Sequence, residues 1–94
     1  MITIERESID LIPGTEFSIG DRVISVEQGG QVGTILCYTV LHHNNVPELN
    51  QIGVVFDADV GGHSLTAINN IPAEARCEDG HGWYCYRSLL QRTK

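Results

Sequence analysis

Apolar and polar residues alternate along much of this chain, which is the two-residue period of a β-strand with one buried face. The first segment with this pattern is ITIE, residues 2–5. The segment VGTILCYTVL is dense in β-branched and aromatic residues and predicts a long strand over residues 32–41. Further strands are predicted over residues 22–27, 51–59 and 83–90, the last with a short helical turn in RSLL. Since no window has the 3.6-residue period of a good amphipathic helix, the pattern predicts an all-β fold.

Glycine, proline and polar residues separate the predicted strands. Pro13, Gly14 and Gly20 mark two turns before the strand at 22–27. Residues 42–50, HHNNVPELN, are polar and contain a proline, so we expect a loop there. A second long loop is expected over residues 69–82.

Five or six short strands in a chain of 94 residues cannot form two large sheets. We therefore predict one domain, residues 1–94, folded as a small, partly open barrel, because curling the sheet leaves fewer exposed edges. The segment Gly20-Asp21-Arg22-Val23 combines a tight turn with the start of a strand, and Gly33-Thr34-Ile35 lies in the following strand. In this G-D-x-V and G-x-I pattern the chain resembles the SH3-like small barrels.

The balance of charges changes which partners we expect. The net charge is −6, from twelve acidic and six basic residues, and Lys94 is the single lysine. Nucleic-acid binders need basic residues to displace counterions from phosphates, so a nucleic-acid-binding barrel is an alternative that would require a local basic face. An acidic surface suits docking onto a basic protein. The first residues hold no apolar run of the length of a signal peptide or membrane span, and three cysteines are too few and odd in number for a disulfide framework, so we expect a cytoplasmic protein.

A second resemblance rests on two motifs of the C-terminal half. The segments IGVVFDADVGGHSL and CEDGHGWYC are similar to a group of small proteins of bacteriophages and their bacterial hosts, with the pattern V-x-F-D, GGH and C-x-x-GHGW-Y. The residues that carry the match are Val55, Phe56, Asp57, Gly61, Gly62, His63, Cys77, Gly80, His81, Gly82, Trp83 and Tyr84. No activity is attached to that group, so the resemblance implies a fold and a phage-related origin, with action in the host cytoplasm. The chain departs from the group in its segment 42–50 and at Cys85.

Zinc binding is one interpretation of these motifs. The candidate ligands are His63, Cys77, His81 and Cys85. An extended four-residue step covers roughly 13 Å, which is too far for two ligands of one ion unless the glycines beside His81 fold the chain back. A small zinc-stabilised domain therefore stays an alternative, while the expectation is that no cofactor is bound.

Catalysis is a second interpretation, in which a cysteine and a histidine form a reactive pair and Asp57 or Asp59 orients the ring. The sequence holds no nucleophile elbow, phosphate loop or metalloprotease helix, and so small a chain encloses little substrate. We therefore expect no enzymatic activity. Binding of a small molecule or nucleotide by the two glycine–histidine loops is a further alternative.

The favoured interpretation is structural. Glycines beside both histidines allow two loops to approach closely, and each imidazole can then donate to a carbonyl of the opposite loop. Trp83 would cover the end of the barrel while its indole N–H finds an acceptor. Cys77 and Cys37 are interpreted as small buried residues. The predicted clamp consists of Gly61, Gly62, His63, Gly80, His81, Gly82 and Trp83.

These expectations lead to a function. We expect a non-enzymatic binding module, encoded by a phage or a bacterium, that binds a host protein and modulates or inhibits it. Tyrosine and arginine are favoured at protein interfaces, so candidate contact residues lie near the last strand and the turn after residue 56. They are Asp57, Asp59, Tyr84, Tyr86 and Arg87, together with the segment 42–50.

Overall fold

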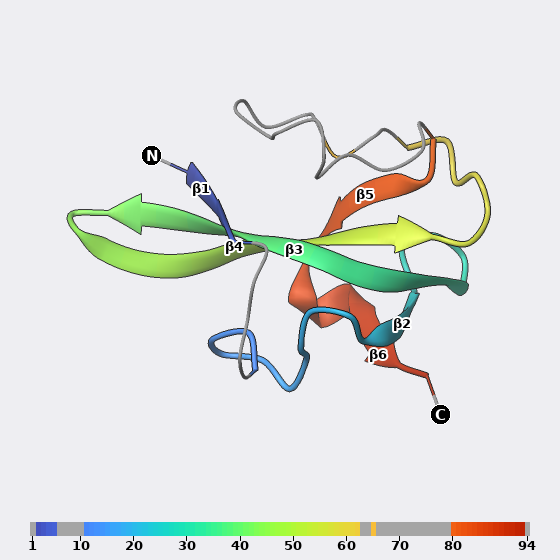
Figure 1. Cartoon of the computed structure of the whole chain (residues 1–94), viewed down its shortest axis with the longest axis horizontal. Coiled ribbons are helices and arrows are strands. Elements are labelled where there is room, and N and C mark those ends of the chain that lie inside the picture. Colours follow the sequence, from blue (N-terminus) through green and yellow to red (C-terminus); the bar gives the residue numbers. More distant parts are fainter. Residues whose placement is uncertain (1, 6–10, 63–64, 66–79, 94) are drawn as a thin grey trace.

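A computed structural model describes residues 2–5, 11–62, 65 and 80–93 of the chain. Figure 1 shows one antiparallel sheet in which β3 and β4 form the longest hairpin. The strands are β1 (Ile2–Glu5), β2 (Arg22–Ser25), β3 (Gln31–His43), β4 (Val46–Phe56), β5 (Gly82–Cys85) and β6 (Leu90–Arg92), with a 3₁₀ turn η2 (Arg87–Leu89) before β6. Among the described residues, no helix has the length and apolar character needed to cross a membrane.

The predicted all-β fold class is confirmed. The six-stranded sheet has the order β5-β4-β3-β2-β6. β2 pairs with the beginning of β3, at residues 31–34. β1 pairs with β3 nearer its end, at residues 38–41. Within the described part of the chain, β5 and β6 each pair along one edge, so the sheet stays open, as expected for a partly open barrel.

The predicted loop at 42–50 is wrong. β3 continues to His43 and β4 begins at Val46, so two asparagines form the whole connection. Asn44 and Asn45 have φ angles of 51° and 65°, the left-handed values that a tight two-residue hairpin turn requires and that asparagine tolerates. Pro47 is accommodated because the outer edge of β4 has no described partner before Ile52. The hairpin therefore projects beyond the other strands (Figure 1).

The predicted strand 83–90 is corrected in its extent, while the short helical turn expected in RSLL is confirmed as η2. It divides into β5, the turn η2 and β6, because Tyr86 stays extended while the backbone N–H of Leu89 bonds to the carbonyl of Tyr86 and closes a turn. This turn redirects the chain so that β6 pairs with β2 and not with β4.

Two bulges interrupt the β3–β4 ladder. Ile35 pairs with Val54, but the next pair is Cys37 with Gly53, so Leu36 is an extra residue. A second irregularity follows Thr39, where Asn50 is the extra residue on β4. The buried hydroxyl of Thr39 accepts from the backbone N–H of Gln51 at 3.0 Å and therefore satisfies a donor that the bulge displaces.

The first bulge divides the apolar residues between two faces. The main core consists of Ile12, Phe17, Val23, Ile35, Ile52, Val54, Phe56, Cys85 and Leu90. On the opposite face Cys37 packs with Leu65 and Tyr84, so the prediction that Cys37 is buried is confirmed. Burial of both faces of the central strands explains why β4 is apolar almost continuously near its end.

Candidate functional site

An apolar groove lies beside the projecting part of the β3–β4 hairpin. Its volume is about 220 Å³. It is lined by Pro13, Tyr38, Val40, His42, Pro47, Glu48 and Leu49.

The positions of the bulges explain why these side chains meet. Tyr38, Val40 and His42 share one face of β3 because strand residues alternate. The extra residue Leu36 places that face on the side of the main core, against which Tyr38 packs. The extra residue Asn50 does the same for Leu49 on β4. The groove is therefore the continuation of the core beyond the point where other strands cover it.

The segment 11–17 forms the opposite wall. Ile12 and Phe17 are fully buried and hold the segment against the core, while Pro13 is exposed between them. Thr15 N–H donates to the Ile12 carbonyl at 3.0 Å, and Gly14 has a φ of 78°, which together with Pro13 gives a type II turn. The Phe17 carbonyl accepts from Ile12 N–H at 2.7 Å and closes the loop.

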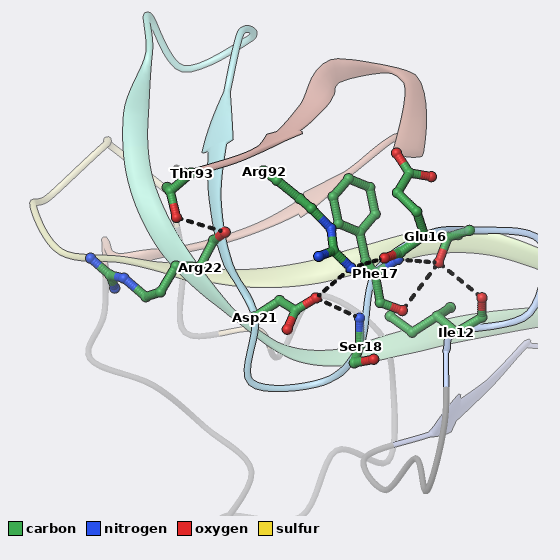
Figure 2. A network of polar contacts seen from close by, with 9 residues as sticks. Ile12, Glu16, Phe17, Ser18, Asp21, Arg22, Arg92 and Thr93 are labelled. Atoms are coloured by element: carbon green, nitrogen blue, oxygen red, sulfur yellow. Dashed lines mark hydrogen bonds and ion pairs between the residues drawn. The ribbon is translucent and has the colours of Figure 1, made fainter.

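The C-terminal strand ties this wall in place (Figure 2). The guanidinium of Arg92 donates to the backbone carbonyl of Glu16 and lies 3.5 Å from the Asp21 carboxylate. The same carboxylate accepts from Ser18 N–H at 2.9 Å. Since the wall is fixed by its own turn and by β6, the groove exists without a ligand and a binding partner need not order it.

The carboxylates elsewhere on the described surface have partners. Asp57 forms a two-pronged ion pair with Arg22, in which Nη1 donates to Oδ1 at 2.8 Å. The hydrogen bonds from Arg22 hold the pKa of Asp57 below its ordinary value. Glu16 lies 3.5 Å from Arg87. Asp57 is thus part of a surface ion pair.

Asp59 and Glu27 have local partners. Oδ1 of Asp59 accepts from Gly61 N–H at 2.7 Å, as in many tight turns. Oε1 of Glu27 accepts from the indole N–H of Trp83 at 2.8 Å, and Trp83 packs partly against the main core. By contrast, Glu48 is exposed on the face of β4 opposite Leu49, and its carboxylate has no hydrogen bond or ion pair in the described part of the chain.

The two glycine-rich turns lie against each other. The backbone N–H groups of Val60 and Gly62 both donate to the Gly80 carbonyl at 3.0 Å. A Cβ atom at Gly62 would lie 2.2 Å from the Gly82 carbonyl oxygen, so no larger residue fits there without movement. The His81 ring donates from Nδ1 to the Phe56 carbonyl at 2.9 Å. These contacts are of the kind expected for a loop clamp, although His63 lies outside the described residues.

Only part of the proposed zinc set falls within the structure, because His63 and Cys77 lie outside the described residues. Cys85 is fully buried in the main core, and its thiol donates to the Trp83 carbonyl at 3.8 Å. Burial raises the pKa of the Cys85 thiol to about 12, which disfavours the thiolate form that a nucleophile needs. In the described ranges, no three histidine, cysteine or acidic side chains gather in a metal-binding arrangement.

The two tyrosines predicted to face a partner lie in different environments. Tyr84 was expected to face a partner, but it is buried on the second face and its hydroxyl donates to the Leu65 carbonyl at 2.7 Å. Its ring is therefore not available to a partner. Tyr86 is 56% exposed because η2 ends the alternation of β5, and Arg87 is exposed beside it.

The sequence did not reveal the groove itself. The segment 42–50 was a candidate for recognition, but Pro13, Tyr38 and Val40 were not. The Asn-Asn pair resembles the asparagine-containing turns of short hairpins and was the available signal for a projecting hairpin. No protein-family model, curated protein or solved structure matches the chain.

Proposed function

We propose that this protein is a non-enzymatic binding module that recognises another protein through the groove beside the β3–β4 hairpin. The observation that carries the proposal is an apolar depression, open to solvent, with two preformed walls. Such a depression buries an apolar side chain of a partner at low entropic cost, because neither wall has to be ordered on binding.

The partner in this proposal is a host protein, and binding modulates or inhibits it. The net charge of −6 favours a basic partner surface. A phage or bacterial origin is supported by the V-x-F-D and GHGW-Y motifs. An SH3-like scaffold is supported by the strand order β5-β4-β3-β2-β6 and by the short turn η2 before the last strand. A cytoplasmic site of action agrees with the free thiols of Cys37 and Cys85.

Filling the groove tests the proposal. Val40→Phe places a larger side chain in the groove, and phenylalanine retains a high preference for strands. Val46→Phe adds the same atoms at the hairpin tip, outside the groove lining. The measurement is affinity capture from host lysate with the wild type and both variants, with thermal unfolding of each to confirm folding.

We expect one protein to be recovered in stoichiometric amount by the wild type and by Val46→Phe, and to be lost with Val40→Phe. Equal recovery by both variants would place the interface elsewhere, and recovery of no protein by the wild type would contradict the proposal.

A further inference from the structure

The second bulge of the β3–β4 hairpin decides which side chains of β4 line the groove. Partners in an antiparallel ladder lie on the same face of the sheet, so Leu49 accompanies its partner Val40 on the groove side. The neighbouring residue, Glu48, is directed to the opposite face. Leu49 has this partner because Asn50 is an extra residue on β4. The lining of the groove therefore depends on the position of the bulge.

The same strands have a second possible pairing, without a bulge at Asn50. Three-residue turns are common in hairpins, and residues 44–46 would form such a turn if the extra residue moved there. The part of β4 between the turn and Gln51 would then shift by one position along β3. Asn50, and not Leu49, would lie opposite Val40.

This shift would reverse the character of the groove. Moving a strand by one residue turns every shifted side chain to the other face of the sheet. Asn50 and Glu48 would enter the groove, while Leu49 and Pro47 would leave it. An apolar wall would become a polar and negatively charged wall, and an apolar side chain of a partner would have to strip it of water.

Thr39 holds the bulge in its observed place. Its side chain is fully buried, and its hydroxyl accepts from the backbone N–H of Gln51 at 3.0 Å and from the side-chain amide of Asn50 at 3.2 Å. The same hydroxyl donates to the Gln51 carbonyl at 3.3 Å. A threonine hydroxyl has one donor and two acceptor sites, so all of them are used on the two residues at the bulge. Loss of the hydroxyl would remove these bonds in the observed pairing and so favour the shifted one.

We infer that Thr39 is a positioning residue that keeps the lining of the groove apolar by pinning the bulge at Asn50; this inference rests on the proposed function. Thr39 acts through Leu49 and not by touching a partner, because its own side chain is fully buried and lies on the face opposite Val40. The hydroxyl therefore determines which class of partner side chain the groove accepts.

The turn contains a second obstacle to the shift. In a three-residue hairpin turn the last residue usually has a left-handed backbone, and this residue would be Val46. β-branched residues resist that conformation, whereas glycine accepts it. Val46→Gly therefore removes the obstacle at the turn and leaves the hydrogen bonds of Thr39 to decide the pairing.

Three variants that share Val46→Gly test the inference. The first has no further change, the second adds Thr39→Ser, which retains a hydroxyl, and the third adds Thr39→Val, which has a methyl group in its place and retains a high preference for strands. The measurement is the pattern of cross-strand nuclear Overhauser contacts of Val40 in each purified protein, without a partner. We expect contacts with Leu49 in the first two variants and with Asn50 in the third.

Contacts of Val40 with Leu49 in the third variant would overturn the inference, and so would contacts with Asn50 in either of the other two. Hydrogen exchange keeps the inference testable if the third variant does not fold. In Thr39→Val alone, with Val46 in place, we expect the Gln51 amide to exchange about tenfold faster than in Thr39→Ser. Equal exchange rates in these two proteins would also overturn the inference.

Capture of the host protein separates this inference from the proposed function. We expect the third variant to lose the captured protein and the first two to retain it. If the third variant has the shifted pairing and still captures the host protein, the groove is not the interface, while the role of Thr39 in the pairing stands. If the pairing does not shift but Val40→Phe loses the captured protein, the inference fails and the proposed function stands.

Discussion

At the scale of single residues, the exposed carboxylates have different roles. Asp57 is held by Arg22, Asp59 accepts from a turn amide, and Glu48 has no partner in the described part of the chain. Exposed ion pairs contribute little to stability in general, but a two-pronged arginine–carboxylate pair is among the stronger ones. The role of a carboxylate in this protein therefore follows from its neighbours and not from its exposure.

The pair between Asp57 and Arg22 has a pH signature. Arg22 lowers the pKa of Asp57 from its ordinary value of 3.8. The stabilisation is therefore fully present above that value and is lost as the pH falls through the lowered pKa of the folded protein. We expect Asp57→Asn to unfold at a lower temperature than the wild type at about pH 7 and at nearly the same temperature at about pH 2.

Thermal unfolding over that pH range provides the measurement. The double variant Asp57→Asn/Arg22→Gln controls for the unpaired arginine that remains in the single variant. A difference between wild type and Asp57→Asn that persists unchanged at the acid end would show that the carboxylate does not act through its charge.

At the scale of elements, the β3–β4 hairpin determines where the groove lies. Its turn consists of Asn44 and Asn45, both with positive φ. Residues other than glycine and asparagine adopt this conformation at a cost of roughly 1–2 kcal/mol each. The length of the hairpin therefore depends on two side chains that make no contribution to the core.

Substitution of Asn45 tests this dependence. We expect Asn45→Ala to lower the free energy of unfolding by about 1 kcal/mol, because alanine resists a left-handed backbone. Asn45→Gly should be no less stable than the wild type, since glycine accepts positive φ without strain. Urea denaturation measures both. Equal midpoints for the alanine and glycine variants would contradict a tight turn at this position.

The sequence predicted the strands better than their pairing. The strand at residues 2–5 and the start of the strand at residue 22 were confirmed. The strand predicted at 32–41 was too short, and the one predicted at 51–59 begins earlier and ends at Phe56. Leu36 could not be identified as an extra residue, because an apolar residue next to a buried position fits the same pattern as regular alternation. The loop prediction at 42–50 failed because Pro47 was interpreted as a strand breaker, whereas it occupies a stretch of β4 without a described outer neighbour.

At the scale of the whole molecule, both described cysteines lie inside. Cys37 is 2% exposed and Cys85 is fully buried. Burial raises the pKa of Cys85 to about 12, so its thiol stays protonated at about pH 8. We expect thiol labelling of a Cys77→Ser variant to be limited by unfolding of the protein.

The measurement is the rate of labelling by a chromogenic disulfide as a function of denaturant. A labelling rate that follows the unfolding rate supports the buried positions of both thiols. Rapid reaction of either thiol under native conditions would contradict its place in the structure. The Cys77→Ser substitution is needed because Cys77 lies outside the described residues.

The groove illustrates why the site was harder to predict than the fold. Strand content follows from neighbours in the sequence, but the groove combines Pro13 with residues of β3 and β4 that lie far along the chain. Tyr84 was placed in the wrong environment for the same reason, since Leu65 covers it only after folding. What the sequence could indicate was the segment 42–50, which supplies His42, Pro47, Glu48 and Leu49.

The two bulges of the hairpin cancel one another in register. Gly33 pairs with Phe56 before the first bulge, and His43 pairs with Val46 after the second. The same two pairs would form in a ladder without either extra residue. In that regular ladder, however, the side chains in the half of the hairpin nearer the turn would point to the opposite faces. Leu41 and Glu48 would then lie against the segment 11–17 in place of Val40 and Leu49. The same sequence of pairs near the tip is thus compatible with two opposite orientations. Small insertions and deletions near residues 36 and 50 give evolution a simple way to exchange one recognition face for another.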